Sequence, residues 1–395
     1  MKKLKVISVI ILVSFLFCSQ TYAEKNIYRI YLPGKDIPKD ILIINPDIAS
    51  YKPGEYIDLV LDQEKFKELR TVWEYRIEIL ETEKTLRSKL DPEYHTYDEV
   101  QTILENYELN NSTLCKLYDI GDAWEKTVGG SSYHIDYRSR EIWMLKISDN
   151  PSIDEEEPEL LFIGAHHARE PISTEVVLYM MNELINGYST DPEIKSWVDN
   201  FEIFFIPILN PDGHAVVLDG ENVWWRKNCR DNDGNHSFVA DNDGVDPNRN
   251  YGWFWGGDGS SPNPEDEIYR GESAFSEPET KAVRKLANER NFYISVSFHS
   301  YGEVVMFPFG YADDSVAPDD STLREISDSV AGKIIRDSDS GTYTSLASRE
   351  FYPAAGDSDD WLYGNNGIFS YTIELATSFI PPGSRINTIS SRAWE

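Results

Sequence analysis

The first hydrophobic feature of the chain is a short apolar run that follows three lysines within the first five residues. The run covers Val6–Phe17, and small residues stand at alternate positions in the TYA segment of residues 21–23, as signal peptidase prefers. It is too short to remain as a membrane span. We therefore predict a signal peptide over residues 1–23 and a mature protein without a membrane anchor, secreted from the cell or into the periplasm of a two-membrane bacterium. Cys18 offers lipidation as an alternative, but the bulky Phe17 before it does not suit that processing.

Between residues 24 and 90, apolar and polar positions alternate over short stretches, which is the period of half-buried strands. The alternating positions are Tyr28–Leu32, then Ile57, Leu59 and Leu61, then Tyr75, Ile77 and Ile79. Asp62 can cap a helix that follows it, and residues 81–90 predict a charged helix that links to the next segment. This mixture predicts a small α+β domain over residues 24–90, with a cleavage point near its end at residues 90–92.

After this domain, the spacing of apolar residues changes to that of helices. Thr96 and Glu99 form a capping box, and apolar residues recur at helical spacing through Tyr107. Further along, apolar runs of strand length alternate with helical stretches. The predicted strands are Ile142–Ile147, Leu160–Ala165, Phe201–Leu209, Ile294–Phe298 and Ser370–Leu375, and the predicted helices include Thr174–Ile185 and Glu277–Asn288. This order predicts a second domain over residues 91–395, of the α/β class, with a mixed, largely parallel central sheet flanked by helices.

Charge and cysteine content narrow the functions that this fold could serve. The 395 residues can bury a large core and carry a formal net charge of −31. Removal of residues 1–23 takes away three lysines and no acid, so the mature charge is (37 − 3) − 68 = −34, which excludes a nucleic-acid-binding role. The acids either keep an exported protein soluble or attract cations and basic peptides. Cys115 and Cys229 remain after export, and sequence alone does not decide whether they form a disulfide.

Two histidines and one acid lie where predicted strands end. The second predicted strand leads directly into the segment HHARE of residues 166–170, and His299 follows the fourth. Because the carboxyl ends of parallel strands meet at one edge of a sheet, we expect His167, Glu170 and His299 to converge. A single histidine at a strand end is more often structural, but two nitrogens and a carboxylate in this placement suit a catalytic zinc ion with an open coordination position. His166 points away from His167 on an extended backbone and is not expected to be a ligand.

These segments resemble known zinc-binding signatures. Residues 158–170 and His299-Ser300-Tyr301 are similar to the two zinc motifs of the metallocarboxypeptidases related to carboxypeptidases A and B, with the bacterial T-type enzymes as the nearest likeness. The resemblance covers Tyr94–Trp394, and the domain before it is similar to the inhibitory propeptide of that family. It implies a Zn²⁺-dependent exopeptidase that hydrolyses the last bond of peptide or protein C-termini with a metal-activated water. We expect the mature enzyme to be a monomer.

The resemblance also implies roles for individual residues. Arg226 would polarise the scissile carbonyl, a task that suits a permanently charged guanidinium. Asn248 and Arg249 would bind the terminal carboxylate of the substrate, so that only chain ends are accepted. Asp246 would accept a hydrogen bond from the first zinc histidine and orient it. Glu374, the one acid in an apolar strand, would be the general base that takes a proton from water and delivers it to the departing amine.

Further positions correspond to substrate contacts of the family. Tyr352 resembles the tyrosine that closes over the bound C-terminus, and Arg169 resembles an additional substrate-contact arginine. Asp359 stands where B-type enzymes carry an acid and A-type enzymes an apolar residue. Gly310 and Ala347 match small pocket residues that leave room for a long side chain. Because a buried acid selects for a cation, we expect basic C-terminal residues to be preferred and apolar ones to be tolerated.

Some alternatives stay open at the level of sequence. The acidic turns at residues 231–235 and 241–244 offer oxygen ligands for Ca²⁺, but such turns are often simply solvated. Only 21 residues follow Glu374 (395 − 374 = 21), so either the C-terminal helix is shorter than the one the family carries or the sequence is truncated. Two other functions fit the same motifs: a zinc amidohydrolase of this fold that acts on peptidoglycan stem peptides, and a non-catalytic module that binds peptide termini. The binding module requires the loss of a ligand or of the base, and none is lost here.

Overall fold

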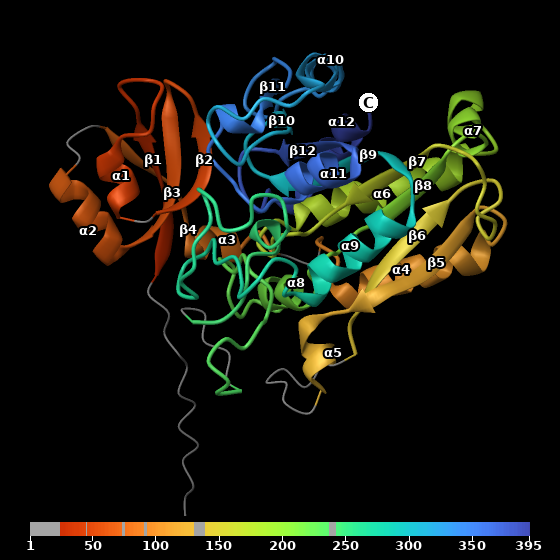
Figure 1. The fold of residues 1–395 in the computed structure, drawn as a ribbon, viewed down its shortest axis with the longest axis horizontal. Helices are drawn as coiled ribbons and strands as arrows, with labels where there is room; N and C mark the ends of the chain where they lie inside the picture. Colours follow the sequence, from red (N-terminus) through yellow and green to blue (C-terminus); the bar gives the residue numbers. More distant parts are fainter. Residues whose placement is uncertain (1–23, 45, 73–75, 91–92, 130–138, 237–241) are drawn as a thin grey trace, which may run out of the picture.

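The computed structural model describes residues 24–395 apart from residues 45, 73–75, 91–92, 130–138 and 237–241. Four sequence predictions lie outside these described residues: the signal peptide, Tyr75 of the strand pattern, Asp91-Pro92 of the cleavage point, and Asp241 of the second acidic turn. Two β-sheets organise the described part of the chain. The smaller belongs to the N-terminal module, residues 24–90, and the larger to the domain that follows it (Figure 1).

The N-terminal module is a four-stranded antiparallel sheet with strand order β2-β3-β1-β4 and three short helices. Its elements are β1 (Lys25–Tyr31), α1 (Lys39–Ile43), β2 (Asp47–Lys52), β3 (Tyr56–Asp62), α2 (Gln63–Val72), β4 (Ile77–Thr82) and α3 (Glu83–Arg87). Ile30 and Leu59 are fully buried in its core. Asp62 caps α2 by accepting hydrogen bonds from two backbone N–H groups, each at 2.8 Å. The α+β arrangement is as predicted, but the linking helix is shorter because β4 extends to Thr82.

The large sheet has eight strands in the order β11-β10-β12-β9-β7-β8-β6-β5. Its strands are β5 (Cys115–Asp122), β6 (Glu141–Ile147), β7 (Glu159–Ile163), β8 (Glu202–Ile206), β9 (Phe292–Ser300), β10 (Val304–Phe307), β11 (Thr344–Ala347) and β12 (Phe369–Leu375). The central strands β12, β9, β7 and β8 are parallel to one another, and antiparallel pairs lie toward both edges. The predicted mixed sheet is confirmed.

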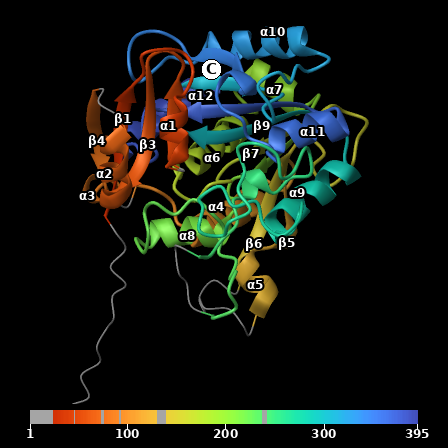
Figure 2. The ribbon, with the colours of Figure 1, turned by 60° about the vertical axis from the view of Figure 1, so that its left-hand side comes forward.

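Helices cover both faces of this sheet (Figures 1 and 2). They are α4 (Tyr97–Asn110), α5 (Trp124–Val128), α6 (Ile172–Gly187), α7 (Pro192–Val198), α8 (Pro211–Leu218), α9 (Pro278–Glu289), α10 (Asp320–Ala331), α11 (Ser358–Asn366) and α12 (Ile386–Trp394). Phe205 of β8 packs in the core that contains α4, α6 and α12, whereas its neighbours Phe204 and Ile206 pack in the core that contains α9 and α11. The central strands are therefore buried on both faces, which explains their continuous apolar runs. The short C-terminal helix α12 packs against α6.

None of the helices in the described part of the chain is long and apolar enough to cross a membrane. The predicted capping box of α4 is confirmed, since Thr96 and Glu99 exchange side-chain and backbone hydrogen bonds.

The carboxyl ends of β7, β9 and β12 meet at one edge, and their boundaries differ from prediction for local reasons. Strand β7 stops before Ala165, which has a left-handed backbone with φ of 50°. Strand β8 stops before Pro207, which has no N–H to continue the ladder. Strand β9 runs through Ser300 because β12 pairs with it to the end, and this pairing sets Glu374 beside His299.

Candidate metal centre and substrate cavity

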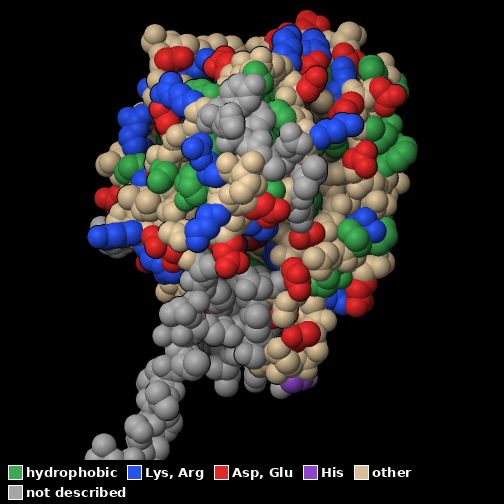
Figure 3. All heavy atoms as spheres, turned by 90° about the vertical axis from the view of Figure 1, so that its left-hand side faces the viewer, with side chains coloured by type: hydrophobic (Ala, Val, Ile, Leu, Met, Phe, Trp, Pro, Cys, Tyr) green, Lys and Arg blue, Asp and Glu red, His purple; other side chains and the backbone are tan. Residues whose placement is uncertain are grey.

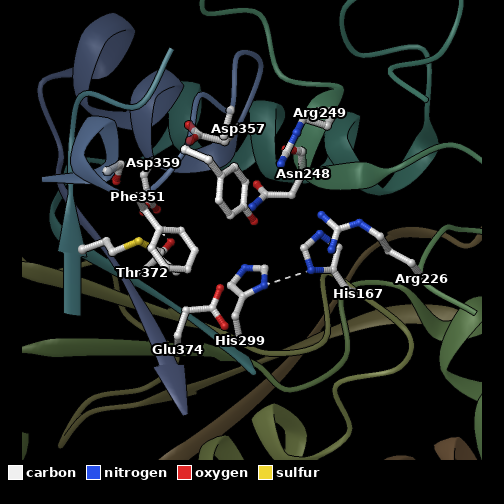
Figure 4. A pocket seen from close by; sticks show the side chains of 14 residues that line it. His167, Arg226, Asn248, Arg249, His299, Phe351, Asp357, Asp359, Thr372 and Glu374 are labelled. Atoms are coloured by element: carbon white, nitrogen blue, oxygen red, sulfur yellow. Dashed lines mark hydrogen bonds between the residues drawn. The ribbon is translucent and has the colours of Figure 1, made fainter. Parts of the chain in front are cut away.

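Three buried side chains bring nitrogen and oxygen atoms together at the ends of β7 and β9. His167 Nδ1 lies 2.8 Å from Glu170 Oε1. His299 Nδ1 lies 2.9 Å from Glu170 Oε2 and 3.1 Å from His167 Nδ1, and the dashed line in Figure 4 joins the two rings. These ligand atoms all lie within 4.8 Å of one another. Two imidazole nitrogens and one carboxylate match the donor set of a catalytic zinc site, so the residues fit this ion.

Asp246 stands behind this donor set and contacts both a ligand and an arginine. Its Oδ1 lies 3.2 Å from His167 Nε2, and its Oδ2 accepts a hydrogen bond from Arg226 Nε at 3.0 Å. Burial would raise the pKa of Asp246, but the charges of Arg226 and His167 outweigh burial and hold this pKa well below its ordinary value. For Glu170 the two histidines likewise outweigh burial and lower the pKa. Both carboxyls are therefore ionised, as metal binding and imidazole orientation require.

Asp246 also begins the turn that carries Asn248 and Arg249. It caps the short helix η3 (Pro247–Arg249) by accepting a hydrogen bond from Asn248 N at 2.8 Å. The Asn248 amide is held through its Oδ1 by the first backbone N–H of α11, at 2.9 Å. Arg249 donates from Nε to the Gly259 oxygen and from Nη1 to the Asn248 oxygen, both at 2.7 Å. Both side chains are buried and therefore hold a fixed orientation.

The two histidines of the metal site, Arg226, Asn248 and Arg249 line one cavity, whose empty space, including the part open to solvent, is about 430 Å³. Figure 4 shows the lining side chains, which are His167, Arg226, Asn248, Arg249, His299, Met306, Ser348, Phe351, Tyr352, Ala354, Asp357, Asp359, Thr372 and Glu374. The Oε2 atom of Glu374 is buried and has no hydrogen-bond partner among the described residues. Burial and the nearby Glu170 raise the pKa of Glu374 well above its ordinary value, against three arginines that oppose the rise. A raised pKa improves a carboxylate as a proton acceptor near neutral pH.

One end of the cavity is acidic. Asp359 Oδ2 accepts a hydrogen bond from Thr372, and Asp359 Oδ1 is buried without a partner in the described part of the chain. Burial and the neighbouring Asp357 raise the pKa of Asp359 to about 8. Burial raises the pKa of Asp357 to about 6. Thr372 is not among the predicted site residues, because a threonine inside a strand carries no functional signal in a single sequence.

Gly310 and Ala347 lie beside the cavity rather than on its wall, which differs from their expected place as pocket residues. Ala347 is fully buried and precedes the wall residue Ser348. A Cβ atom on Gly310 would stand 2.8 Å from Ser348 Cβ and 3.5 Å from Asp357 Oδ2. Their small size therefore lets Ser348 and Asp357 pack closely, and any effect on the width of the pocket is indirect.

Tyr352 lines the cavity, whereas Arg169 is occupied elsewhere. Arg169 is fully buried and donates from both terminal nitrogens to the carboxylate of Asp47, at 2.5 and 2.7 Å. Its guanidinium carbon also lies 4.3 Å from the ring centre of Phe379. Asp47 begins β2 of the N-terminal module, and nothing in its sequence context predicts a contact with a residue more than a hundred positions away. In this structure Arg169 pairs with the module, and its contact with substrate stays a prediction.

The N-terminal module packs directly against residues of the cavity. Met306 and Phe351, which line the cavity, share a hydrophobic cluster with module residues such as Tyr51. The rings of Tyr51 and Phe351 lie 6.2 Å apart. Nearby, Asp58 of β3 accepts a hydrogen bond from the hydroxyl of Tyr301 at 3.1 Å. The two ribbon views agree that the module lies against one end of the large sheet (Figures 1 and 2).

The face that carries the module shows Lys and Arg side chains interspersed with Asp and Glu (Figure 3). The large negative charge of the chain is therefore not concentrated on this face.

The acidic turns and the cysteines offer weaker signals. Asp231, Asp233 and Asp243 bring oxygens within 4.8 Å of one another. However, each accepts a hydrogen bond from a backbone N–H of its own loop region, as solvated turns do. Calcium binding there stays a prediction. Cys115 and Cys229 are buried free thiols, so no disulfide joins them in this structure.

The fold and the donor set together define an α/β protein with a metal site of the catalytic zinc type. Comparison with known proteins agrees with this class. The description "Zinc carboxypeptidase" is that of the family that matches residues 100–395, well over half of the chain. This chain belongs to the zinc carboxypeptidase family.

Individual relatives support the same assignment. The chain is 33% identical over 297 residues to a zinc carboxypeptidase of Saccharothrix mutabilis subsp. capreolus, a match that covers 73% of this chain and 63% of that protein. It is 29% identical over 310 residues to carboxypeptidase B of Astacus astacus, covering 76% of this chain and 94% of that one. The crystal structure of carboxypeptidase A from Helicoverpa armigera has the same fold, with a TM-score of 0.79 at 20% identity over 95% of this chain and 96% of that one.

Proposed function

We propose that this chain is a secreted, monomeric zinc carboxypeptidase that removes single residues from the C-termini of peptides and proteins. One observation carries the proposal: the two histidines of the metal site, Glu374, Arg226 and Arg249 line the same cavity. A metal site alone does not distinguish the ends of a peptide. Guanidinium and amide groups in fixed orientation beside it favour a terminal carboxylate, so the cavity suits an exopeptidase.

The reacting groups come from the loop after β7 and from the carboxyl ends of β9 and β12. A zinc ion held by His167, Glu170 and His299 would supply Lewis acidity, which polarises a carbonyl and makes water more acidic. Glu374 is placed to accept a proton from the attacking water at Oε2 and to give it to the nitrogen of the departing amino acid. The C–N bond breaks, the oxygen of water joins the carbonyl carbon, and the proton count balances.

The remaining polar groups bind substrate. Arg226 is placed to stabilise negative charge on the carbonyl oxygen, and its ion pair with Asp246 holds it in position. Arg249 and Asn248 are placed to bind the terminal carboxylate. These side chains are buried, so their charges are less screened by water than on an exposed surface, which strengthens them.

Asp359 supports a preference for basic C-terminal residues, with apolar residues tolerated. Its free carboxylate oxygen is buried at the acidic end of the cavity, and burial makes an unpaired negative charge costly there. The cation of a Lys or Arg side chain would relieve this cost. A leucine side chain would leave Asp359 protonated and neutral, so such substrates would bind less tightly.

We also propose that the N-terminal module is an inhibitory propeptide. Asp47 occupies Arg169, and Tyr51 of the same strand packs on Phe351, next to Tyr352. Phe351 and Tyr352 line the cavity, so the contact of Tyr51 brings the module to the cavity wall. Limited proteolysis between the module and the domain, followed by removal of the module, should raise activity on a short peptide. Equal activity of the intact and cleaved protein would contradict this role.

One experiment tests the proposed reaction. Cleaved protein is incubated with peptides that differ only in the last residue, with and without a chelator, and the products are identified by mass spectrometry. We expect stepwise loss of C-terminal residues that stops with the chelator and in Glu374→Gln, but continues in the exposed-site control Glu325→Gln. Cleavage inside the peptides, or release only from peptidoglycan stem peptides, would refute the proposal. Binding of peptide ends without cleavage would indicate a binding module instead.

A further inference from the structure

The two histidines of the metal site have different partners behind them. His167 Nε2 lies beside the carboxylate of Asp246, 3.2 Å away. His299 Nε2 lies 3.0 Å from a neutral group, the hydroxyl of Ser297 on the same strand. A metal-binding imidazole usually needs such a partner to fix its tautomer and ring orientation. The question is whether a lone hydroxyl suffices for His299.

Ser297 does not stand alone but begins a chain of hydrogen-bonding groups. Its Oγ lies 2.9 Å from Nδ1 of His166, and Nε2 of His166 lies 3.0 Å from the hydroxyl of Tyr251. His166, Ser297, Tyr251 and His299 are each at most 1% exposed. The rings of His166 and His299 are stacked, with centres 5.4 Å apart and 20° between planes. His166 is thus no ligand, as predicted from its direction, yet it contacts the partner of a ligand.

When His299 binds metal, one order of donors and acceptors lets Ser297 both accept and donate within this series of groups. A ligand nitrogen at Nδ1 needs a free lone pair, so His299 Nε2 carries the proton and donates to Ser297 Oγ. The one hydrogen of Ser297 then points to His166 Nδ1, which accepts it. His166 consequently carries its proton on Nε2 and donates to the Tyr251 oxygen. Every link has a donor and an acceptor, and no group changes its charge.

The far end of the chain reaches the loop that binds the substrate carboxylate in the proposed function. Tyr251 lies two residues after Arg249, its backbone N–H donates to the Gly356 oxygen at 2.9 Å, and its ring packs against Phe275 and Trp361. Its hydroxyl is therefore held by the fold and does not depend on the metal. The chain links this fixed point to the metal site through His166, which follows β7.

We propose that His166 and Ser297 are positioning residues that hold His299 in its metal-binding tautomer and orientation, with Tyr251 as their anchor. They support His299 as Asp246 supports His167. The support comes from polarised neutral hydrogen bonds, whereas Asp246 acts through its charge. The proposal rests on the zinc site of the proposed function. It concerns metal affinity and geometry, and needs no peptide substrate to be tested.

The test measures zinc affinity of the full chain by competition with a chromogenic chelator, and ligand geometry by the visible spectrum of the cobalt-substituted protein. Ser297→Ala and His166→Phe should each weaken zinc binding by about tenfold and alter the cobalt spectrum, since partners of metal ligands typically contribute 10- to 100-fold. The double variant should lose little more zinc affinity than either single variant, because both substitutions interrupt the same series of hydrogen bonds. His166→Asn, whose side-chain oxygen can accept from Ser297, should restore most of the affinity.

Ser295→Ala is the matched control, because Ser295 lies two positions before Ser297 on the same strand, is also 1% exposed, and takes no part in the chain. It should bind zinc as the unmodified protein does. Unchanged zinc affinity in His166→Phe and Ser297→Ala, or losses that simply multiply in the double variant, would overturn the proposal. If either variant fails to fold, zinc affinity is compared between Tyr251→Phe and His166→Asn instead. Tyr251→Phe removes the anchoring hydroxyl and should weaken zinc binding, whereas His166→Asn should keep most of it. Failure of the unmodified chain to bind zinc would instead refute the proposed function.

Discussion

Asp359→Asn provides the sharpest test of substrate preference, because it removes one carboxylate at the acidic end of the cavity and keeps the shape of the side chain. We expect kcat/KM for peptides that end in Arg or Lys to fall strongly, and kcat/KM for peptides that end in Leu to change little. The reason is that only a cationic side chain converts Asp359 from its neutral form into a paired carboxylate.

The size of the effect follows from two opposing costs. With a pKa of about 8, Asp359 is roughly one-tenth ionised at pH 7, so its ionisation for a cationic substrate costs about 1.4 kcal/mol. Removal of one partner from a buried ion pair costs about 3–5 kcal/mol. The difference, about 2–4 kcal/mol, corresponds to a loss of roughly 30- to 1000-fold in kcat/KM for a basic end. Below pH 8 the preference for basic over apolar ends should rise about tenfold per pH unit, and level off above it.

The assay compares dipeptides with a blocked N-terminus that differ only in a C-terminal Arg or Leu, and measures kcat/KM from pH 6 to pH 9. Asp357→Asn is the matched control. Asparagine caps a helix about as well as aspartate, so α11 should keep its start. Loss of the Asp357 charge lowers the pKa of Asp359, because this charge is the second cause of its rise after burial. The control should therefore keep the preference for Arg and extend it to lower pH.

Three results would contradict this reasoning. The first is an Arg-to-Leu ratio that Asp359→Asn leaves unchanged, which would mean that Asp359 does not contact the leaving residue. The second is a preference that disappears in Asp357→Asn but survives in Asp359→Asn, because the recognition carboxylate would then be Asp357. A ratio that does not vary between pH 6 and pH 8 would show that Asp359 is already ionised in the free cavity.

The remaining predictions concern the base, the carboxylate site, the module and stability. Glu374→Gln should lower kcat by roughly 10²–10⁴-fold at unchanged zinc content, measured by steady-state kinetics and elemental analysis, and a full rate would exclude Glu374 as the base. Arg249→Lys should raise KM because the forked contact is lost, and a peptide with an amidated C-terminus should be equally poor with both forms. Asp47→Ala should raise the activity of the intact chain, since Arg169 is released; no change would assign inhibition to packing alone. The pKa of Asp359 is raised on folding, so its stabilising contribution is present near pH 4 and lost as pH rises through about 8. Asp359→Asn should accordingly raise Tm at pH 9 more than at pH 5, measured by calorimetry.

The local signals in the sequence predicted the elements that position the site. The apolar runs of β7, β9 and β12 are long enough to identify as buried strands, and the polar residues at their ends mark the edge where the site forms. The exact ends were less predictable. Ala165 takes a left-handed backbone to start the loop that carries His167, and this conformation depends on the fold around it.

The groups that could not be predicted make their contacts through packing between distant segments. Asp47 becomes a partner of Arg169 only when the module sits on the domain. Ser297 and Tyr251 look like ordinary interior residues, and their relation to His299 depends on His166 lying between them. Thr372 joins the cavity because α11 and β12 lie side by side. A single sequence identifies residues whose chemistry is unusual for their position. It gives no signal for a functional residue of a type that is common at its position.

Asp246 shows why the metal site and the carboxylate site cannot vary independently. One oxygen lies beside His167, the other accepts from Arg226, and the same side chain caps the helix that carries Asn248 and Arg249. Asp246→Asn would keep the cap and lose the charge, so zinc affinity should fall and Arg226 should become mobile while Arg249 stays in place. Asp246→Ala would disturb the carboxylate site as well. The two variants are therefore compared by zinc affinity and by the inhibition constant of a free amino acid that mimics the C-terminal residue. The comparison separates the effect of the Asp246 charge on His167 and Arg226 from the effect of the helix cap on Arg249. Equal inhibition constants in both would mean that the cap does not control the position of Arg249.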